Sequence, residues 1–148
     1  MEHKEIFNDL VIVMDTLRAE CPWDKKQTIQ TLSNLTVEEV YELTEAIALE
    51  DWDNLKEELG DVLLHILFYA KIASEKGKFT LSDMMSTQIE KLKRRHPHIY
   101  GDLKVADEAE VKRNWEQIKL SEGKKSVLGG VPKSLTAVIK AYRMQDKA

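Results

Sequence analysis

Residues 37–43 read Val-Glu-Glu-Val-Tyr-Glu-Leu, and residues 57–64 read Glu-Glu-Leu-Gly-Asp-Val-Leu-Leu. Each segment places two acidic residues three positions apart among apolar ones: Glu39 with Glu42, and Glu58 with Asp61. An α-helix has about 3.6 residues per turn, so each pair predicts two carboxylates on one side of a helix. If the two helices pack together, the four charges meet at an interface that is partly shielded from water. Such a cluster raises its own pKa values or recruits cations, and a hard divalent metal is the natural solution.

Apolar residues recur with helical spacing almost throughout the chain, and no strong run alternates apolar and polar residues as a strand would. We therefore predict an all-α fold. The expected helices cover about residues 5–19, a short turn at 28–33, a helix that starts at 36, and further helices over 52–76, 82–95, 107–122 and 134–145. Gly129-Gly130-Val131-Pro132 is expected to break the chain before the last of them. Gly77 is expected to end the 52–76 helix, and Asp107 with Glu110 is a capping signal for the 107–122 helix.

Length and composition limit the class of protein. With 148 residues the chain has the size of one ordinary domain, and we expect residues 1–148 to form it. A net charge of −4 argues against a protein that coats nucleic acids without sequence preference. The single cysteine, Cys21, excludes an internal disulfide and suits a reducing cytosol. The N-terminus lacks a signal-peptide core, and the most apolar stretch, 62–73, is too short to span a membrane. We expect a soluble, cytoplasmic protein without membrane or nucleic-acid polymer partners.

Several acidic-segment residues have an alternative interpretation. Thr36 and Glu39 fit a capping box at a helix start, which explains Glu39 without a metal but leaves Glu42 unexplained. Glu38 is either an acid that complements the helix dipole or a group that orients a water or holds a second ion. Gly60 costs about 1 kcal/mol relative to alanine within a helix, which suggests that a neighbouring helix or a ligand approaches there, with a simply tolerated glycine as the alternative.

Basic and aromatic residues supply candidate phosphate and base contacts. Lys91 and Arg95 share a helix face and are typical of a phosphate clamp, or else they complement a helix C-terminus. Trp115 and Lys119 repeat that spacing and place an aromatic plane beside an ammonium group. Trp115 and the loop residue Trp23 are candidates for stacking on a base, with burial in the core as the alternative.

His65 follows Asp61 by one turn, where it either orients that carboxylate or serves as a hydrogen-bonded core residue. The sequence contains no glycine-rich phosphate loop of the P-loop or dinucleotide type. Phosphate binding must therefore rest on a metal and on basic side chains.

Together these motifs resemble the MazG-type nucleoside triphosphate pyrophosphohydrolases, members of the all-α NTP pyrophosphatase superfamily. That family's signature is two adjacent glutamates, a third three residues on, and a distal Glu-x-x-Asp. The matching segments are Glu38-Glu39-x-x-Glu42, Glu58-x-x-Asp61, Cys21-Pro22-Trp23-Asp24, residues 91–98 and residues 115–119. The resemblance covers about residues 7 to 145.

The resemblance implies a MazG-like helical bundle with a four-helix-bundle-type core, completed by dimerisation. It also implies that Glu39, Glu42, Glu58 and Asp61 bind Mg²⁺, with Mn²⁺ as a substitute, that Lys91, Arg95 and Lys119 face the triphosphate, and that Trp115 lies near the nucleotide. Asn54 occupies a position that is basic in some relatives. The segment 123–148 resembles the one that leads into a second domain in tandem relatives.

From this we expect Mg²⁺-dependent hydrolysis of nucleoside triphosphates to monophosphate and pyrophosphate, with Glu38 a candidate for orienting the attacking water. The resemblance also implies a homodimer that removes surplus or aberrant nucleotides. A non-catalytic helical module that senses nucleotide or binds a partner is the main alternative. A carboxylate-bridged di-iron oxidase is disfavoured, because that chemistry expects Glu-x-x-His, and neither Glu39 nor Glu58 is followed by histidine at that spacing.

Overall fold

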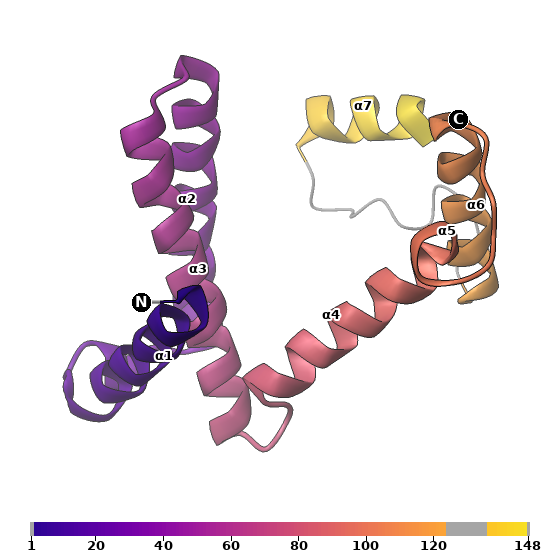
Figure 1. The fold of residues 1–148 in the computed structure, drawn as a ribbon. Helices are drawn as coiled ribbons and strands as arrows, with labels where there is room; N and C mark the ends of the chain where they lie inside the picture. The colour runs from indigo at the N-terminus through magenta and orange to yellow at the C-terminus, as the bar shows by residue number, and fades with distance from the viewer. Residues whose placement is uncertain (1, 124–135, 148) are drawn as a thin grey trace. The chain divides into compact units, whose positions relative to one another are not determined.

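The computed structural model describes residues 2–123 and 136–147, and these are helical with no strand among them. The elements are α1 (His3–Glu20), the 3₁₀ turn η1 (Asp24–Lys26), α2 (Ile29–Leu49), α3 (Trp52–Glu75), α4 (Leu81–Arg95), α5 (Pro97–Tyr100), α6 (Glu108–Ser121) and α7 (Ala137–Lys147) (Figure 1). This confirms the all-α prediction. The chain divides into two compact units, residues 1–85 and 86–148, with the division inside α4.

Helices α2 and α3 form an antiparallel hairpin in the first unit (Figure 1). The connection between them is tight because Glu50 adopts a left-handed conformation (φ 54°) and Asp51 caps α3 by accepting from the Asn54 amide at 3.1 Å. Ala46 is fully buried near this turn. A small side chain at that position allows the two helices to approach closely.

Helix α2 begins earlier than the sequence suggested. Thr28 caps its start by accepting from the Thr31 amide at 3.1 Å, and the helix then runs without a break to Leu49. Thr36 therefore lies inside the helix, where its hydroxyl donates to the Leu32 carbonyl at 2.9 Å. The expected break near residue 33 and the capping box of Thr36 with Glu39 are both wrong. Glu39 has no capping role, because it has no free helix-start amide to satisfy.

The core of the first unit lies where α1 crosses the end of the hairpin that is opposite the α2–α3 turn. Its fully buried residues come from α1, α2 and α3: Met14, Leu32, Leu67, Phe68 and Ile72. Burial of each such side chain contributes about 1.5–3 kcal/mol, so this end of the hairpin is the firmly packed end. Toward the α2–α3 turn many apolar side chains are instead exposed: Val37, Val40, Tyr41, Ile47, Trp52 and Leu59.

Arg18 fastens the loop that carries Trp23 to this core. Its guanidinium donates to the backbone carbonyls of Asp24 and of Gln27, the latter at 3.1 Å. The same group forms a salt bridge with Glu75 at 2.8 Å, near the end of α3. Helix α3 ends at Glu75, and the predicted terminating residue, Gly77, follows with a positive φ of 61° that glycine adopts without strain.

The second unit contains the end of α4 together with α5, α6 and α7. Arg94 and Arg95 both bind the Glu122 carboxylate at the end of α6. Asp107 caps α6 by accepting from the Glu110 amide at 2.8 Å, as the sequence predicted. Helix α7 overlaps the predicted last helix but ends two residues later, at Lys147, whereas the break predicted at 129–132 lies outside the described residues. No helix in the described part of the chain is long and apolar enough to cross a membrane.

Candidate metal centre

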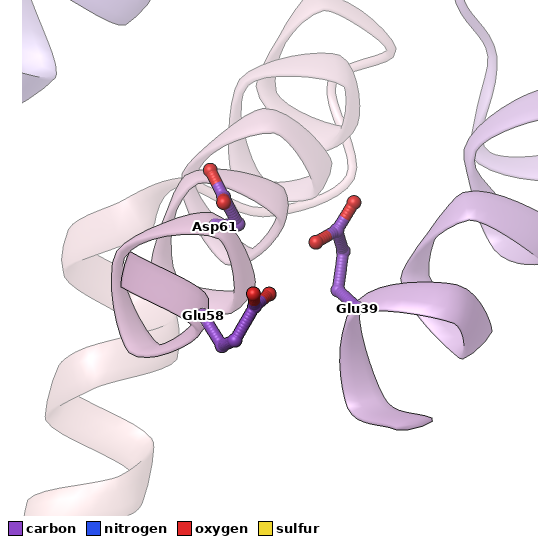
Figure 2. Close-up of side chains that lie close together, drawn as sticks. All are labelled: Glu39, Glu58 and Asp61. Atoms are coloured by element: carbon purple, nitrogen blue, oxygen red, sulfur yellow. The ribbon is translucent and has the colours of Figure 1, made fainter. Parts of the chain in front are cut away.

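Three predicted metal ligands converge between α2 and α3. Glu39 on α2 and Glu58 and Asp61 on α3 each offer one carboxylate oxygen, and these three oxygens lie within 4.8 Å of one another. Figure 2 shows the Glu39 side chain facing the other two across the space between the helices. The i, i+3 spacing brings Glu58 and Asp61 together, and the packing of the hairpin adds Glu39.

The environment of Glu39 and Glu58 disfavours the charged forms of these two carboxylates. Burial, followed by the charges of Asp61, Glu42 and Glu38, raises the pKa of Glu39 above its usual range. Burial, followed by the charge of Glu42 and then those of its other acidic neighbours, likewise raises the pKa of Glu58. A bound cation would reverse both effects, because an opposite charge favours the ionised form.

Glu58 gives the clearest sign of a missing partner. Its residue is buried, and its Oε2 atom is fully enclosed yet accepts no hydrogen bond. Within the described part of the chain, no salt bridge involves Glu39, Glu58 or Asp61. A buried carboxylate oxygen without a donor is costly. The donor set consists of hard carboxylate oxygens, which fits Mg²⁺ or Mn²⁺ and does not fit a soft metal.

Glu42 and Glu38 lie at the edge of this centre. Both side chains are exposed, and neither belongs to the set of three converging oxygens. Glu42 is nevertheless the charge with the largest effect on the pKa of Glu58, so it is close enough to act on the site. Its role as a fourth ligand, and that of Glu38 in orienting water, remain predictions.

Gly60 lies between Glu58 and Asp61 on α3. A Cβ atom built there would meet no atom within 4 Å. The expectation that a neighbouring helix approaches Gly60 is therefore wrong for the described part of the chain. The open space is compatible with the approach of a ligand or a second protein chain, and equally with a glycine that the helix simply tolerates.

Of the predicted phosphate and base contacts, four lie in the second unit. Lys119 stands 6.0 Å from the centre of the Trp115 ring, which confirms that this spacing sets an ammonium beside an aromatic plane. Lys119 also pairs with Glu116, and Arg95 is held by Glu122. Lys91 is half-buried. Trp115 is half-buried as well and meets His96 edge-on, with ring centres 5.0 Å apart.

Trp23 lies in the first unit, and its side chain is 54% exposed, so the core alternative is wrong for this residue. The Arg18 contacts described above fix the backbone that carries it. Trp23 therefore presents a free aromatic face from a well-anchored loop. Such a face is able to stack on a nucleobase.

His65 is a buried, hydrogen-bonded residue on α3. Its Nδ1 atom lies 2.9 Å from the Thr36 hydroxyl of α2, and burial lowers its pKa although the charge of Asp61 acts to raise it. The core alternative for His65 thus holds. The sequence did not indicate its partner, Thr36, because that residue was assigned to a helix start; nor did it indicate Tyr69, whose hydroxyl contacts the same Thr36 oxygen at 2.6 Å.

Comparison with known proteins identifies the family. The profile of the MazG nucleotide pyrophosphohydrolase domain matches residues 27–100, which include the whole α2–α3 hairpin and its acidic cluster. The chain is 42% identical over 145 residues to the nucleoside triphosphate pyrophosphohydrolase of Escherichia coli, covering 93% of this chain and 55% of that protein. It is 45% identical over 148 residues to the nucleoside triphosphate pyrophosphohydrolase/pyrophosphatase MazG of Thermotoga maritima, covering 97% and 56%.

A solved structure agrees with this match. The crystal structure of a mazG-related protein from Thermotoga maritima superposes with a TM-score of 0.68 at 28% identity, covering 76% of this chain and 98% of that one. The chain therefore belongs to the MazG nucleotide pyrophosphohydrolase family. It spans about half the length of the two curated relatives above.

Proposed function

We propose that this protein hydrolyses nucleoside triphosphates to the monophosphate and pyrophosphate with the help of Mg²⁺. Two observations at one place carry the proposal: one carboxylate oxygen each from Glu39, Glu58 and Asp61 converge, and the buried Glu58 Oε2 atom has no hydrogen-bond donor. Two relatives bear the name of this activity, and the chain matches them over more than nine-tenths of its length.

Each acidic residue has a distinct part in this proposal. Glu39, Glu58 and Asp61 hold Mg²⁺, or Mn²⁺ in its place, and Glu42 completes the set from the exposed edge. The ion supplies electrostatic stabilisation of the negative charge that develops on the pyrophosphate leaving group. Glu38 is exposed beside Glu39 and is our candidate for orienting the water that attacks the α-phosphorus.

Substrate recognition is assigned to the basic and aromatic residues. We propose that Lys91, Arg95 and Lys119 bind the triphosphate oxygens and that Trp23 and Trp115 contact the base or sugar. Arg95 must then exchange its carboxylate partner, Glu122, for phosphate. We further propose a cytoplasmic homodimer that removes surplus or aberrant nucleotides, with residues 1–148 acting as one catalytic domain.

Product analysis tests the reaction. The protein is incubated with a mixture of ribo- and deoxynucleoside triphosphates and Mg²⁺, and pyrophosphate and orthophosphate are assayed separately. Pyrophosphate in equal amount to monophosphate supports the proposal. Orthophosphate with diphosphate would contradict the site of cleavage. Nucleotide-dependent thermal stabilisation without any product would instead indicate a non-catalytic nucleotide-binding module.

Two neutral variants test the acidic residues individually. Glu42→Gln and Asp61→Asn should keep the helical circular-dichroism spectrum, because both side chains are exposed, and should lower turnover by about 100-fold or more. Lys104→Gln, on an exposed loop residue of the second unit, is a control that should keep full activity. Turnover near the wild-type rate in both acidic variants would overturn the assignment.

A further inference from the structure

A single hydroxyl joins the two helices that carry the acidic cluster. The Thr36 Oγ1 atom of α2 lies 2.9 Å from Nδ1 of His65 and 2.6 Å from the hydroxyl of Tyr69, both on α3. We call Thr36, His65 and Tyr69 the helix clamp. In the described part of the chain, these are the side-chain hydrogen bonds that connect α2 with α3.

One arrangement of hydrogens satisfies every contact of the helix clamp. Thr36 has one hydroxyl hydrogen, which it donates to the Leu32 carbonyl at 2.9 Å. Its oxygen therefore accepts from the Tyr69 hydroxyl and from Nδ1–H of His65, and its two lone pairs satisfy both donors. Burial lowers the pKa of His65, which favours the neutral ring that this arrangement uses. The two contacts with α3 are made at once by one oxygen, so the arrangement tolerates little displacement of α2 along or away from α3.

The helix clamp lies next to the metal centre on both helices. Thr36 precedes Glu39 by three residues on α2, and His65 follows Asp61 by four on α3, so each is one turn from a cluster residue. In this antiparallel hairpin both turns lead toward the packed core. Figure 2 shows that Glu39 on one side faces Glu58 and Asp61 on the other. The repulsion among these carboxylates acts to separate the helices one turn away from the point where the helix clamp joins them.

We propose that Thr36, His65 and Tyr69 are positioning residues that hold α2 against α3 so that Glu39 stays within ligand distance of Glu58 and Asp61 before a divalent cation binds. This inference rests on the proposed metal-dependent function. Hydrogen-bonding partners that orient metal ligands commonly change metal affinity by 10–100-fold when removed, although those partners usually touch the ligand directly. Here the effect is transmitted through the spacing of two helices.

Manganese titration of the full chain, followed by electron paramagnetic resonance in the absence of nucleotide, tests the proposal. Thr36→Val keeps the shape of the side chain and removes its hydroxyl, and it should weaken Mn²⁺ binding by about 10-fold. Thr36→Ser retains the hydroxyl and should bind Mn²⁺ as the wild type does. Tyr69→Phe removes one of the two bonds to α3 and should give a smaller loss, which provides a second variant if Thr36→Val does not fold.

A matched variant separates positioning from general stability. Ile72→Val shortens a fully buried core residue that belongs neither to the helix clamp nor to the cluster. It should lower the melting temperature and leave Mn²⁺ affinity unchanged. If Thr36→Val lowers only the melting temperature, as Ile72→Val does, the helix clamp is purely structural and the inference is overturned. If the wild type itself binds no Mn²⁺, the proposed function fails together with the inference.

A metal-free double-mutant cycle gives an independent readout. Glu39→Gln removes one repelling charge. Introduced into the wild-type protein, it should raise the free energy of unfolding in the presence of a chelator. It should stabilise the Thr36→Val protein less, because helices without the helix clamp are already free to move apart and relieve the repulsion. Equal stabilisation in both backgrounds would show that the helix clamp does not hold the carboxylates together.

Discussion

At the scale of single residues, the acidic cluster makes the stability of the folded protein depend on pH. The pKa values of Glu39 and Glu58 are raised in the folded protein, so both groups favour folding most when protonated. In the metal-free protein this contribution is full below the ordinary value of 4.5 and is lost as the pH rises through the raised pKa values. Glu122 behaves in the opposite sense, because its bonds to Arg95 and Arg94 lower its pKa to about 2.

Chemical denaturation across pH with a chelator present measures both effects. The double variant Glu39→Gln with Glu58→Gln should lack the loss of stability that the wild type shows above pH 4.5. Glu122→Gln should lack the loss that the wild type shows as the pH falls from 4.5 toward 2. A double variant whose stability changes with pH as the wild type's does would show that the two carboxylates are not crowded in the folded state.

The residues of the cluster could be predicted from spacing, but their surroundings could not. Glu58 and Asp61 share a helix, so the i, i+3 rule was sufficient to pair them. The same rule paired Glu39 with Glu42, yet the structure brings Glu39 rather than Glu42 to the converging oxygens. That choice depends on the rotation of α2 against α3, which the packing of Leu32 and Leu67 sets and no local pattern encodes.

At the scale of elements, the hairpin shows where local signals compete. Thr28 and Thr36 are both acceptable helix caps, and Thr36 with Glu39 matches the capping box more fully. The structure uses Thr28, because an uninterrupted α2 buries Leu32 completely and keeps Leu35 against the core. The gain from apolar burial exceeds the typical cap energy of about 1 kcal/mol. Signals without a competitor, such as Gly77 after α3 and Asp107 before α6, gave correct helix ends.

Gly60 provides a prediction for the same hairpin. Gly60→Ala should stabilise the isolated protein by up to about 1 kcal/mol, because alanine favours the helix and its methyl group meets no atom within 4 Å. Thermal unfolding with a chelator measures this. If substrate or a second chain approaches Gly60, the same variant should reduce turnover or dimerisation while it raises the melting temperature.

The matching control for this substitution is Gly77→Ala. Gly77 has a positive φ of 61°, so alanine is strained there although space is available, and the variant should be less stable than the wild type. Destabilisation by Gly60→Ala in the metal-free protein would mean that the backbone of α3 between Glu58 and Asp61 is not the regular helix described above.

At the scale of the whole molecule, the first unit exposes several large apolar side chains on its α2–α3 hairpin. The half of the hairpin nearer the α2–α3 turn presents five apolar side chains, each with more than half of its surface exposed: Val37, Tyr41, Ile47, Trp52 and Leu59. Exposed apolar patches of this kind commonly mark a protein interface. The proposed homodimer accounts for them, since a second copy of the hairpin would supply the two helices that a four-helix core requires.

Sedimentation equilibrium tests the dimer. The wild type should have about twice the 17.1 kDa mass of one chain. Ile47→Lys places a charge on the exposed hairpin face and should shift the protein toward monomer, whereas Leu103→Lys, on an exposed loop of the second unit, should leave the mass unchanged. A monomeric wild type at all concentrations would exclude the homodimer and leave the apolar surface to another partner.

Metal binding by the intact protein tests the central claim most directly. Isothermal titration of Mg²⁺ into the wild type and into Glu58→Gln compares two proteins that differ in the carboxylate with the unpartnered buried oxygen. We predict saturable binding by the wild type, with a rise in melting temperature, and loss of both in Glu58→Gln, which should nevertheless be more stable than the metal-free wild type. Equal Mg²⁺ binding by the two proteins would contradict a metal centre at Glu39, Glu58 and Asp61.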